Sequence, residues 1–279
     1  MHFSDLNRLN FINPEPSSSG PQVTNVNQLK QSFLHELKAL GEEGDSEANF
    51  MLGLRAYNGA DKPPNVAVAA EYWQQAAKKW HLDAIYNLAL LYLKGKGVDH
   101  SPSMAIALLY DACSQHHPGA INRLGCHYWW GDLVQQDREK SLSLFVYARQ
   151  LGSSEAAYNL GIYCLSSNAS HGDIKNGIWY LSQAAKEEQP DAMARLATFF
   201  EGEYPEFVDH VSAKKWRELA ATFGHIPSQL QLASGYLFQG EIYTAYNWLR
   251  EASAQGHEPS KILKQQLNRL LIVDNNNLS

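Results

Sequence analysis

The chain has 279 residues, of which 44% are hydrophobic and 19% are charged, and its formal net charge is −6. This apolar content excludes a wholly disordered protein, and 19 Gly with 11 Pro exclude a collagen-like or low-complexity chain. An acidic chain also lacks the excess of Lys and Arg that drives binding to phosphate backbones, so we expect no nucleic-acid partner.

The cysteines and the hydropathy pattern bear on the compartment. Cys113, Cys126 and Cys164 are too few for a disulfide-stapled domain, and a reducing compartment fits them best. The first ten residues, MHFSDLNRLN, have no unbroken apolar run of the kind that marks a secretory signal. The longest strongly apolar stretch, Ala84 to Leu93, is about half the length that crosses a bilayer. We therefore expect a cytoplasmic protein that does not insert in a membrane.

The two ends of the chain differ from its middle. Residues 1–24 contain three prolines and a run of serines, and we expect them to form a flexible tail. Residues 25–44 have apolar residues at helical spacing, which predicts an N-terminal capping helix. Residues 258–279 predict a C-terminal capping helix and tail by the same pattern.

An internal repeat dominates the residues between these ends. Alanine recurs every 36 residues, at Ala48, Ala84, Ala120, Ala156 and Ala192. A leucine follows each of these alanines by four residues, and the residue after that leucine is Gly or Ala. A sixth, shorter unit begins near Ser228. The period predicts six units, whose approximate bounds are 45–80, 81–116, 117–152, 153–188, 189–224 and 225–257.

Each unit has the pattern of two amphipathic helices, here called helix A and helix B. Side chains that cap helix N-termini precede helix B at Asn65, Ser101, Asp137 and Ser212. Glycines that end helix B in the left-handed conformation are expected at Gly152, Gly224 and Gly256. Small residues on helix A let the two helices approach closely. The bulky residues expected between them are Trp73, Phe145, Trp179, Trp216 and Trp248.

The second unit carries the most complete motif. Its sequence, AIYNLALLYLKGKGVDHSPSMAIALLYDAC, has Leu88, Tyr92, Gly95, Gly97 and Val98 in the order Ala-x-x-x-Leu-Gly-x-x-Tyr-x-x-Gly-x-Gly-Val. This pattern resembles the Sel1-like repeat, a relative of the tetratricopeptide repeat, and the resemblance extends from about Asp45 to His257. It implies an all-α, right-handed α/α superhelical solenoid that takes part in the assembly of protein complexes.

By analogy with tetratricopeptide repeats, helix A lines a concave binding surface. The residues two and three positions after the start alanine that we expect on this surface are Tyr86, Asn87, Arg123, Tyr158, Asn159 and Arg195. Their amide and guanidinium groups donate hydrogen bonds that suit peptide carbonyls or carboxylates. Stacking between repeats is the alternative role for the same row.

Trp129 and Trp130 stand side by side near the end of one helix A. Neighbouring helical residues diverge by about 100°, so both rings cannot enter one seam between helices. At least one is expected to reach a groove, where tryptophan is a frequent interface anchor. The alternative is that the pair packs against the loop of a neighbouring repeat.

Acidic residues at the start of helix A, such as Glu47 and Asp83, favour a partner with apolar anchors and few acidic residues.

A second class of function depends on cysteine and histidine. Sulfur and imidazole, which are zinc ligands, lie near one another in sequence at Cys113, His116, His117, Cys126 and His127. Their spacing matches no standard zinc site. The repeat register places Cys113 and Cys126 at positions where other repeats have packed apolar residues. A hydrolase or metal-binding protein that uses this group is therefore an alternative.

No catalytic motif with a nucleophile and a base occurs in the sequence. The sequence predicts a non-enzymatic scaffold or adaptor without a cofactor, which binds a peptide segment or a protein surface and whose oligomeric state is left open. A further alternative is an inhibitor or immunity-type protein that binds one dedicated enzyme.

Overall fold

The computed structural model describes residues 23–60, 63–166 and 170–276. These residues form helices joined by short loops, and no strand occurs among them. The predicted all-α repeat fold is confirmed, while the right-handed winding stays a prediction. Nearly all of the predicted tail, residues 1–24, lies outside the described residues.

The helices alternate as expected. Helix A of the successive repeats is α2 (Ser46–Asn58), α4 (Leu82–Lys94), α6 (Pro118–Trp130), α8 (Ser154–Cys164), α10 (Pro190–Thr198) and α12 (Ile226–Phe238). Helix B is α3 (Val66–Lys78), α5 (Pro102–Ser114), α7 (Arg138–Gln150), α9 (His171–Lys186), α11 (His210–Thr222) and α13 (Ile242–Ala254). The flanking helices are α1 (Val23–Glu42) and α14 (Glu258–Asn276). A π-helical turn, Phe199–Glu203, continues α10.

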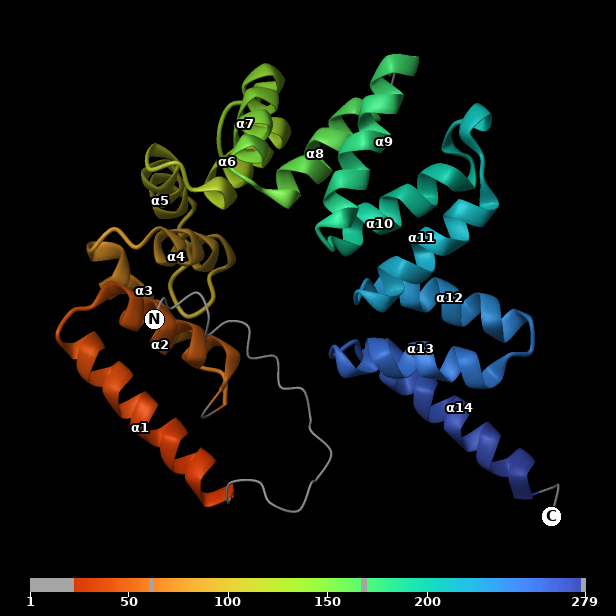
Figure 1. Cartoon of the computed structure of the whole chain (residues 1–279), viewed down its shortest axis with the longest axis horizontal. Coiled ribbons are helices and arrows are strands. Elements are labelled where there is room, and N and C mark those ends of the chain that lie inside the picture. Colours follow the sequence, from red (N-terminus) through yellow and green to blue (C-terminus); the bar gives the residue numbers. More distant parts are fainter. Residues whose placement is uncertain (1–22, 61–62, 167–169, 277–279) are drawn as a thin grey trace. The chain divides into compact units, whose positions relative to one another are not determined.

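The described residues form two compact units, and the division falls within α4. The first unit runs to Leu91 and takes in Gly95–Asp99, and the second comprises Tyr92–Lys94 and the described chain from His100 onwards. In the first unit α1 packs on α2 and α2 packs on α3. In the second unit the helices from α5 to α14 pack side by side in chain order (Figure 1).

The N-caps follow the repeat period. In helix B the side chains of Asn65, Ser101 and Asp137 accept hydrogen bonds from backbone amides of the first turn, so these predicted caps are confirmed. The predicted cap at Ser212 is wrong, because α11 begins at His210, three residues before the start that this cap implies, and Asp209 caps it. The Asp209 carboxylate accepts from the Ser212 amide at 3.1 Å and from the Ser212 hydroxyl at 2.6 Å. A carboxylate accepts hydrogen bonds from the amides of a first helical turn more strongly than a neutral hydroxyl does.

The ends of helix B share one backbone conformation. Gly152, Gly224 and Gly256 have φ values of 93°, 91° and 85°, which confirms the predicted left-handed ends. In the other three repeats the same position has a side chain and the same sign of φ, at Trp80, His116 and Glu188. Each costs roughly 1–2 kcal/mol relative to a right-handed residue, so the repeat geometry overrides local preference at these places.

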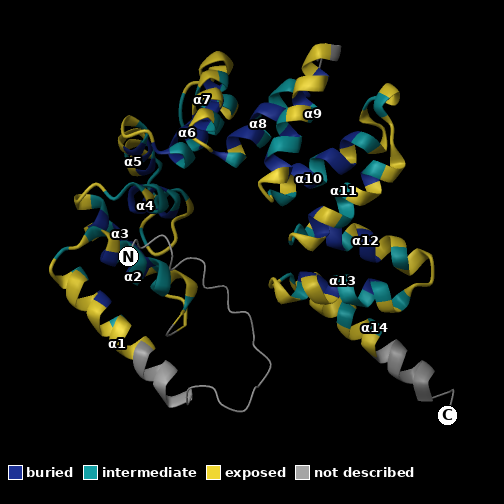
Figure 2. Ribbon diagram, viewed as in Figure 1, coloured by how far each residue is buried: buried dark blue, intermediate teal, exposed yellow. Residues whose placement is uncertain are grey.

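Helix A and helix B pack most closely at the small residue that follows the repeat leucine. A Cβ atom built on Gly53 would lie 2.3 Å from the Trp73 indole nitrogen, and one on Gly125 would lie 2.7 Å from the Phe145 ring. Trp73 and Phe145 are buried, as predicted. The buried residues therefore gather in the seams between helices (Figure 2).

Trp179 does not supply bulk between helices, contrary to the prediction. It is 56% exposed, and Leu181 instead fills the seam against Gly161. The repeat period places Leu181 in register with Trp73 and Phe145, and two residues along a helix is about 200° of rotation. Helix phase, and not the size of the side chain, decides which residue packs. Trp216 and Trp248 are half-buried against the apolar clusters of the second unit.

Replacing Gly53 by alanine should destabilise the fold by about 1–3 kcal/mol, because the added methyl group overlaps the buried Trp73 indole. Helix propensity alone predicts the opposite sign, a gain of about 1 kcal/mol. Gly235 in α12 is the matched control, because a methyl group added there would meet no described atom within 4 Å beyond its own helix backbone. Gly235→Ala should therefore stabilise by about 0.5–1 kcal/mol. Urea denaturation followed by circular dichroism measures both changes, and equal signs would contradict the packing argument.

Candidate protein-binding surface

Two tryptophans at the end of α6 form the most exposed part of the candidate surface. Trp130 is 73% exposed, whereas Trp129 is half-buried. Their rings meet edge to face, with 6.4 Å between the ring centroids. Trp130 thus presents a large apolar side chain to solvent, and the Trp129 ring packs against it.

Trp129 is held in place by the next two helices. Its ring lies 5.5 Å from that of Tyr163 on α8, and the Arg138 guanidinium lies 4.8 Å from its centroid. The Gln136 side-chain amide also donates to the Trp129 carbonyl oxygen at 2.8 Å. Trp129 is therefore a packing residue between repeats, and its neighbour Trp130 is the one that remains exposed.

A small cavity lies beside the tryptophans and is lined by α6, α7 and α8. Its volume is about 170 Å³. Its lining consists of Cys126, Trp129, Trp130, Phe145, Tyr158, Asn159, Ile162 and Tyr163. Four of the residues expected at the binding surface are brought together here: Trp129, Trp130, Tyr158 and Asn159. We call this cavity the aromatic pocket.

The polar groups of the aromatic pocket are already engaged or neutral. The Asn159 amide donates to the Asn122 side-chain oxygen at 2.7 Å and contacts the Cys126 sulfur at 3.5 Å. Burial raises the pKa of the Cys126 thiol and that of the Tyr158 hydroxyl, so both groups are uncharged at neutral pH. The aromatic pocket therefore offers an uncharged, mainly apolar surface.

Other residues of the expected row lie elsewhere. Arg195 on α10 forms an ion pair with Glu203, whose hydrogen bonds raise the pKa of the guanidinium. Arg123 is half-buried on α6 and does not line the aromatic pocket. Tyr86 and Asn87 are half-buried on α4, within the first unit. The Glu203 partner was not predicted, because the π-helical turn that carries it has no recognised signal in the sequence.

The cysteines and histidines of the alternative site have separate roles. The His117 ring accepts from the Ala120 amide at 3.0 Å as the cap of α6, and His116 hydrogen-bonds the Tyr147 hydroxyl at 2.6 Å. His127 pairs with Asp132 at 2.9 Å. Burial raises the pKa of the Cys113 thiol to about 12. Within the described ranges no three His, Cys, Asp or Glu side chains come together as metal ligands would.

In the part of the chain that the structure describes, every helix is too short or too polar to cross a bilayer.

Two curated relatives from yeasts match most of this chain. It is 24% identical over 303 residues to the chitin synthase regulator SKT5 of Saccharomyces cerevisiae, covering 88% of this chain and 43% of that protein. It is 26% identical over 292 residues to chitin synthase regulatory factor 2 of Schizosaccharomyces pombe, covering 94% of this chain and 56% of that protein. The chain spans about half the length of these relatives.

A solved structure and a family profile agree on the fold. A Sel1 repeat protein from Oxalobacter formigenes has a TM-score of 0.65 at 22% identity, covering 82% of this chain and 95% of that chain. The family described as Sel1 repeat matches six segments: 46–79, 82–117, 118–153, 154–188, 190–225 and 227–257. These segments make up most of the sequence, and so the chain belongs to the Sel1 repeat family.

Proposed function

We propose that this chain is a non-enzymatic scaffold that binds another protein through the aromatic pocket and exposed Trp130. Its curated relatives are named as regulators of chitin synthase, and regulation through a protein contact needs a binding surface and no catalytic centre. Membership of the Sel1 repeat family supports the same role, because helical repeat arrays present extended binding surfaces.

The observation that carries the proposal is the exposure of Trp130 beside a cavity. An indole that is 73% exposed leaves a large apolar area in water, and that area is removed from water when a partner covers it. Tyr163 and Arg138 contact the Trp129 ring, and the Trp129 ring in turn contacts that of Trp130. A surface that is already ordered loses little conformational entropy on binding.

The aromatic pocket also defines the chemistry of the partner. At about 170 Å³ it is smaller than the 300–1,000 Å³ of typical small-molecule sites, so it suits one side chain better than a whole ligand. Its lining is aromatic and uncharged. A partner segment with an apolar or aromatic anchor residue fits it best.

Affinity capture from a lysate of the source organism tests the proposal. Wild type, Trp130→Ala and Trp179→Ala are compared as baits, and captured proteins are quantified by mass spectrometry. Trp179 is the matched control because it is also an exposed tryptophan of the second unit. We expect a protein that wild type and Trp179→Ala capture equally and that Trp130→Ala loses.

Equal capture by all three baits would contradict the proposed surface. The stoichiometry of the captured complex separates two versions of the function. Several partners at low occupancy indicate a general scaffold, and one partner bound at equal stoichiometry indicates a dedicated inhibitor.

A further inference from the structure

An arginine in α11 stands where the other repeats have a buried apolar residue. The 36-residue period, shortened in the sixth repeat, relates Arg217 to Trp73, Leu109, Phe145, Leu181 and Leu249. Each of these five residues is at most 3% exposed. The Arg217 side chain is itself only 11% exposed. A buried cation at a packing position is costly unless it has a partner, so an acidic group is expected beside Arg217.

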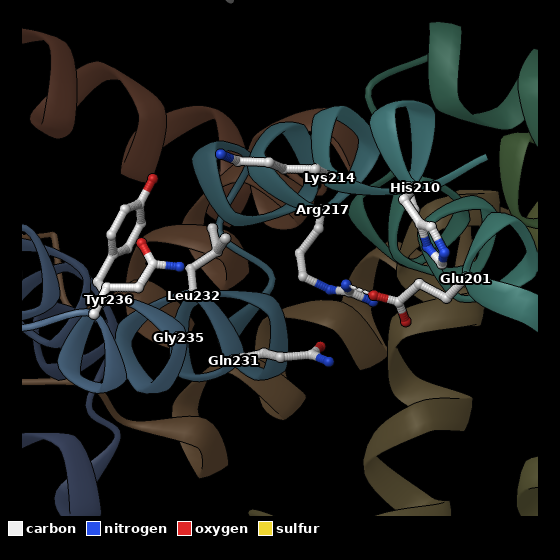
Figure 3. A pocket seen from close by; sticks show the side chains of 10 residues that line it. Glu201, His210, Lys214, Arg217, Gln231, Leu232, Gly235 and Tyr236 are labelled. Atoms are coloured by element: carbon white, nitrogen blue, oxygen red, sulfur yellow. Dashed lines mark ion pairs between the residues drawn. The ribbon is translucent and has the colours of Figure 1, made fainter.

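A cavity adjoins Arg217, between α11 and α12. Its volume is about 300 Å³. Lys214 and Arg217 reach it from α11, and Gln231 and Tyr236 reach it from α12, with Glu201 at one end (Figure 3). We call it the Arg217 cavity. Ala213, Leu232 and Gly235 make up much of the remaining lining, so charged and polar groups lie beside apolar surface in this cavity.

The charges of the Arg217 cavity favour an anion. Arg217 and Lys214 are the cations in the lining, and Glu201 is the carboxylate there. Lys214 also lies 3.9 Å from Glu218, but this pair is on the surface, where water weakens it. One carboxylate therefore faces two full positive charges, and the cavity has an excess of positive charge.

Arg217 forms an ion pair with Glu201, which is 37% exposed. A guanidinium group has five N–H donors, and a carboxylate accepts two of them in a bidentate pair. Arg217 therefore keeps the capacity to donate to a second acceptor. The partial exposure of Glu201 also gives an incoming carboxylate a route to replace it.

The segment that carries Glu201 is unusual. It is the π-helical turn Phe199–Glu203, and Gly202 within it has a φ of 146°. π-Helical turns of this kind are frequent at functional sites. Glu203, the last residue of the turn, forms an ion pair with Arg195. Gly202 lies between Glu203 and Glu201 in the sequence. Glu201 thus belongs to a local irregularity of the repeat and not to a regular helix face.

We infer that the Arg217 cavity binds a carboxylate on a short aliphatic chain, namely the acidic side chain of a partner protein. Arg217 is its anchor, Lys214 is the second cation, and Glu201 is the internal carboxylate that it displaces. This inference rests on the proposed function, because the acidic side chain belongs to a bound partner. It adds a polar contact in the fifth and sixth repeats to the apolar one at Trp130.

The experiment follows the arginine Nε–Hε signals of the full chain by nuclear magnetic resonance. The probes are the peptides acetyl-Gly-Glu-Gly-amide and acetyl-Gly-Gln-Gly-amide, and free glutarate. We expect the Glu peptide to shift the Arg217 signal saturably and the Gln peptide to leave it unchanged. Glu201→Gln should bind the Glu peptide about threefold or more tightly than wild type, because the internal competitor has lost its charge.

Arg217→Leu should weaken binding of the Glu peptide by about tenfold or more. This variant should still fold, because leucine occupies the same position in other repeats, as at Leu109 and Leu181. For this variant binding is followed by the amide signals of α12, since the Arg217 signal is absent. An equal response to both peptides, or no saturable shift even in Glu201→Gln, overturns the inference. Binding of glutarate without binding of the Glu peptide overturns the assignment to a protein side chain.

The two proposals fail separately. The titration contains no partner protein and does not involve Trp130, so its failure leaves the capture result standing. If Trp130→Ala captures partners normally, the aromatic pocket is excluded as the binding surface while the carboxylate titration remains valid.

Discussion

Replacing Trp73 by alanine should lower the free energy of unfolding by about 3–5 kcal/mol, the usual cost of removing a buried aromatic ring. Trp73 is 2% exposed and packs against Gly53. Its indole nitrogen also donates to the Phe50 carbonyl oxygen at 3.3 Å, and Tyr57 lies 5.6 Å from its ring. The substitution leaves a cavity in the seam between α2 and α3 and a carbonyl without this donor.

Trp179→Ala is the matched control for this prediction. Trp179 is 56% exposed and has an edge-to-face contact with Tyr180 at 4.9 Å. Its removal should therefore change the free energy of unfolding by less than about 1 kcal/mol. Native-state hydrogen exchange measures each effect locally, in α2 and α3 for the first variant and in α8 and α9 for the second. Similar losses at both sites would show that the seam at Trp73 is not the stabilising contact.

Trp130→Ala should weaken the affinity for the captured partner by about 30-fold or more, which corresponds to about 2 kcal/mol or more for an interface hot spot. The stability of the free protein should change little, because the ring that is removed is mostly exposed. Isothermal titration calorimetry gives the affinity, and thermal denaturation gives the stability.

Trp129→Ala distinguishes binding from packing at the same place. Trp129 supports Trp130 and contacts Tyr163 and Arg138, so its removal should lower both the affinity and the stability. Trp179→Ala should change neither by much. A Trp130→Ala variant that loses affinity only together with its fold would contradict a direct contact with the partner.

Much of the helical pattern could be read from the sequence. The alanine period predicted the pairs of helices, and local side-chain chemistry predicted the caps at Asn65, Ser101 and Asp137. These features depend on residues that lie within one turn of each other, so they can be recognised without knowledge of the tertiary structure. The cap of α11 was misplaced because two capping residues compete there and Asp209 carries the stronger acceptor.

The candidate surface was predicted only in part. The sequence singled out Trp129 and Trp130 because two adjacent aromatic residues cannot share one seam, and it did not say which one is buried. That choice depends on Tyr163 and Arg138, which come from other helices. Arg195 was predicted as a free donor, and its pairing with Glu203 depends on the π-helical turn after α10.

By itself, the sequence determined the repeat unit, its period, most of its caps and the family, because each repeat encodes the same local pattern of small, apolar and capping residues. The tertiary structure decided which side chains of that pattern are buried and which remain exposed to solvent or to a cavity. Helix phase buries Leu181 and exposes Trp179, contacts with α7 and α8 hold Trp129 and leave Trp130 in solvent, and the seam between α11 and α12 leaves a cavity beside Arg217. The physical reason is that burial depends on the neighbouring helices, which lie tens of residues away in the sequence.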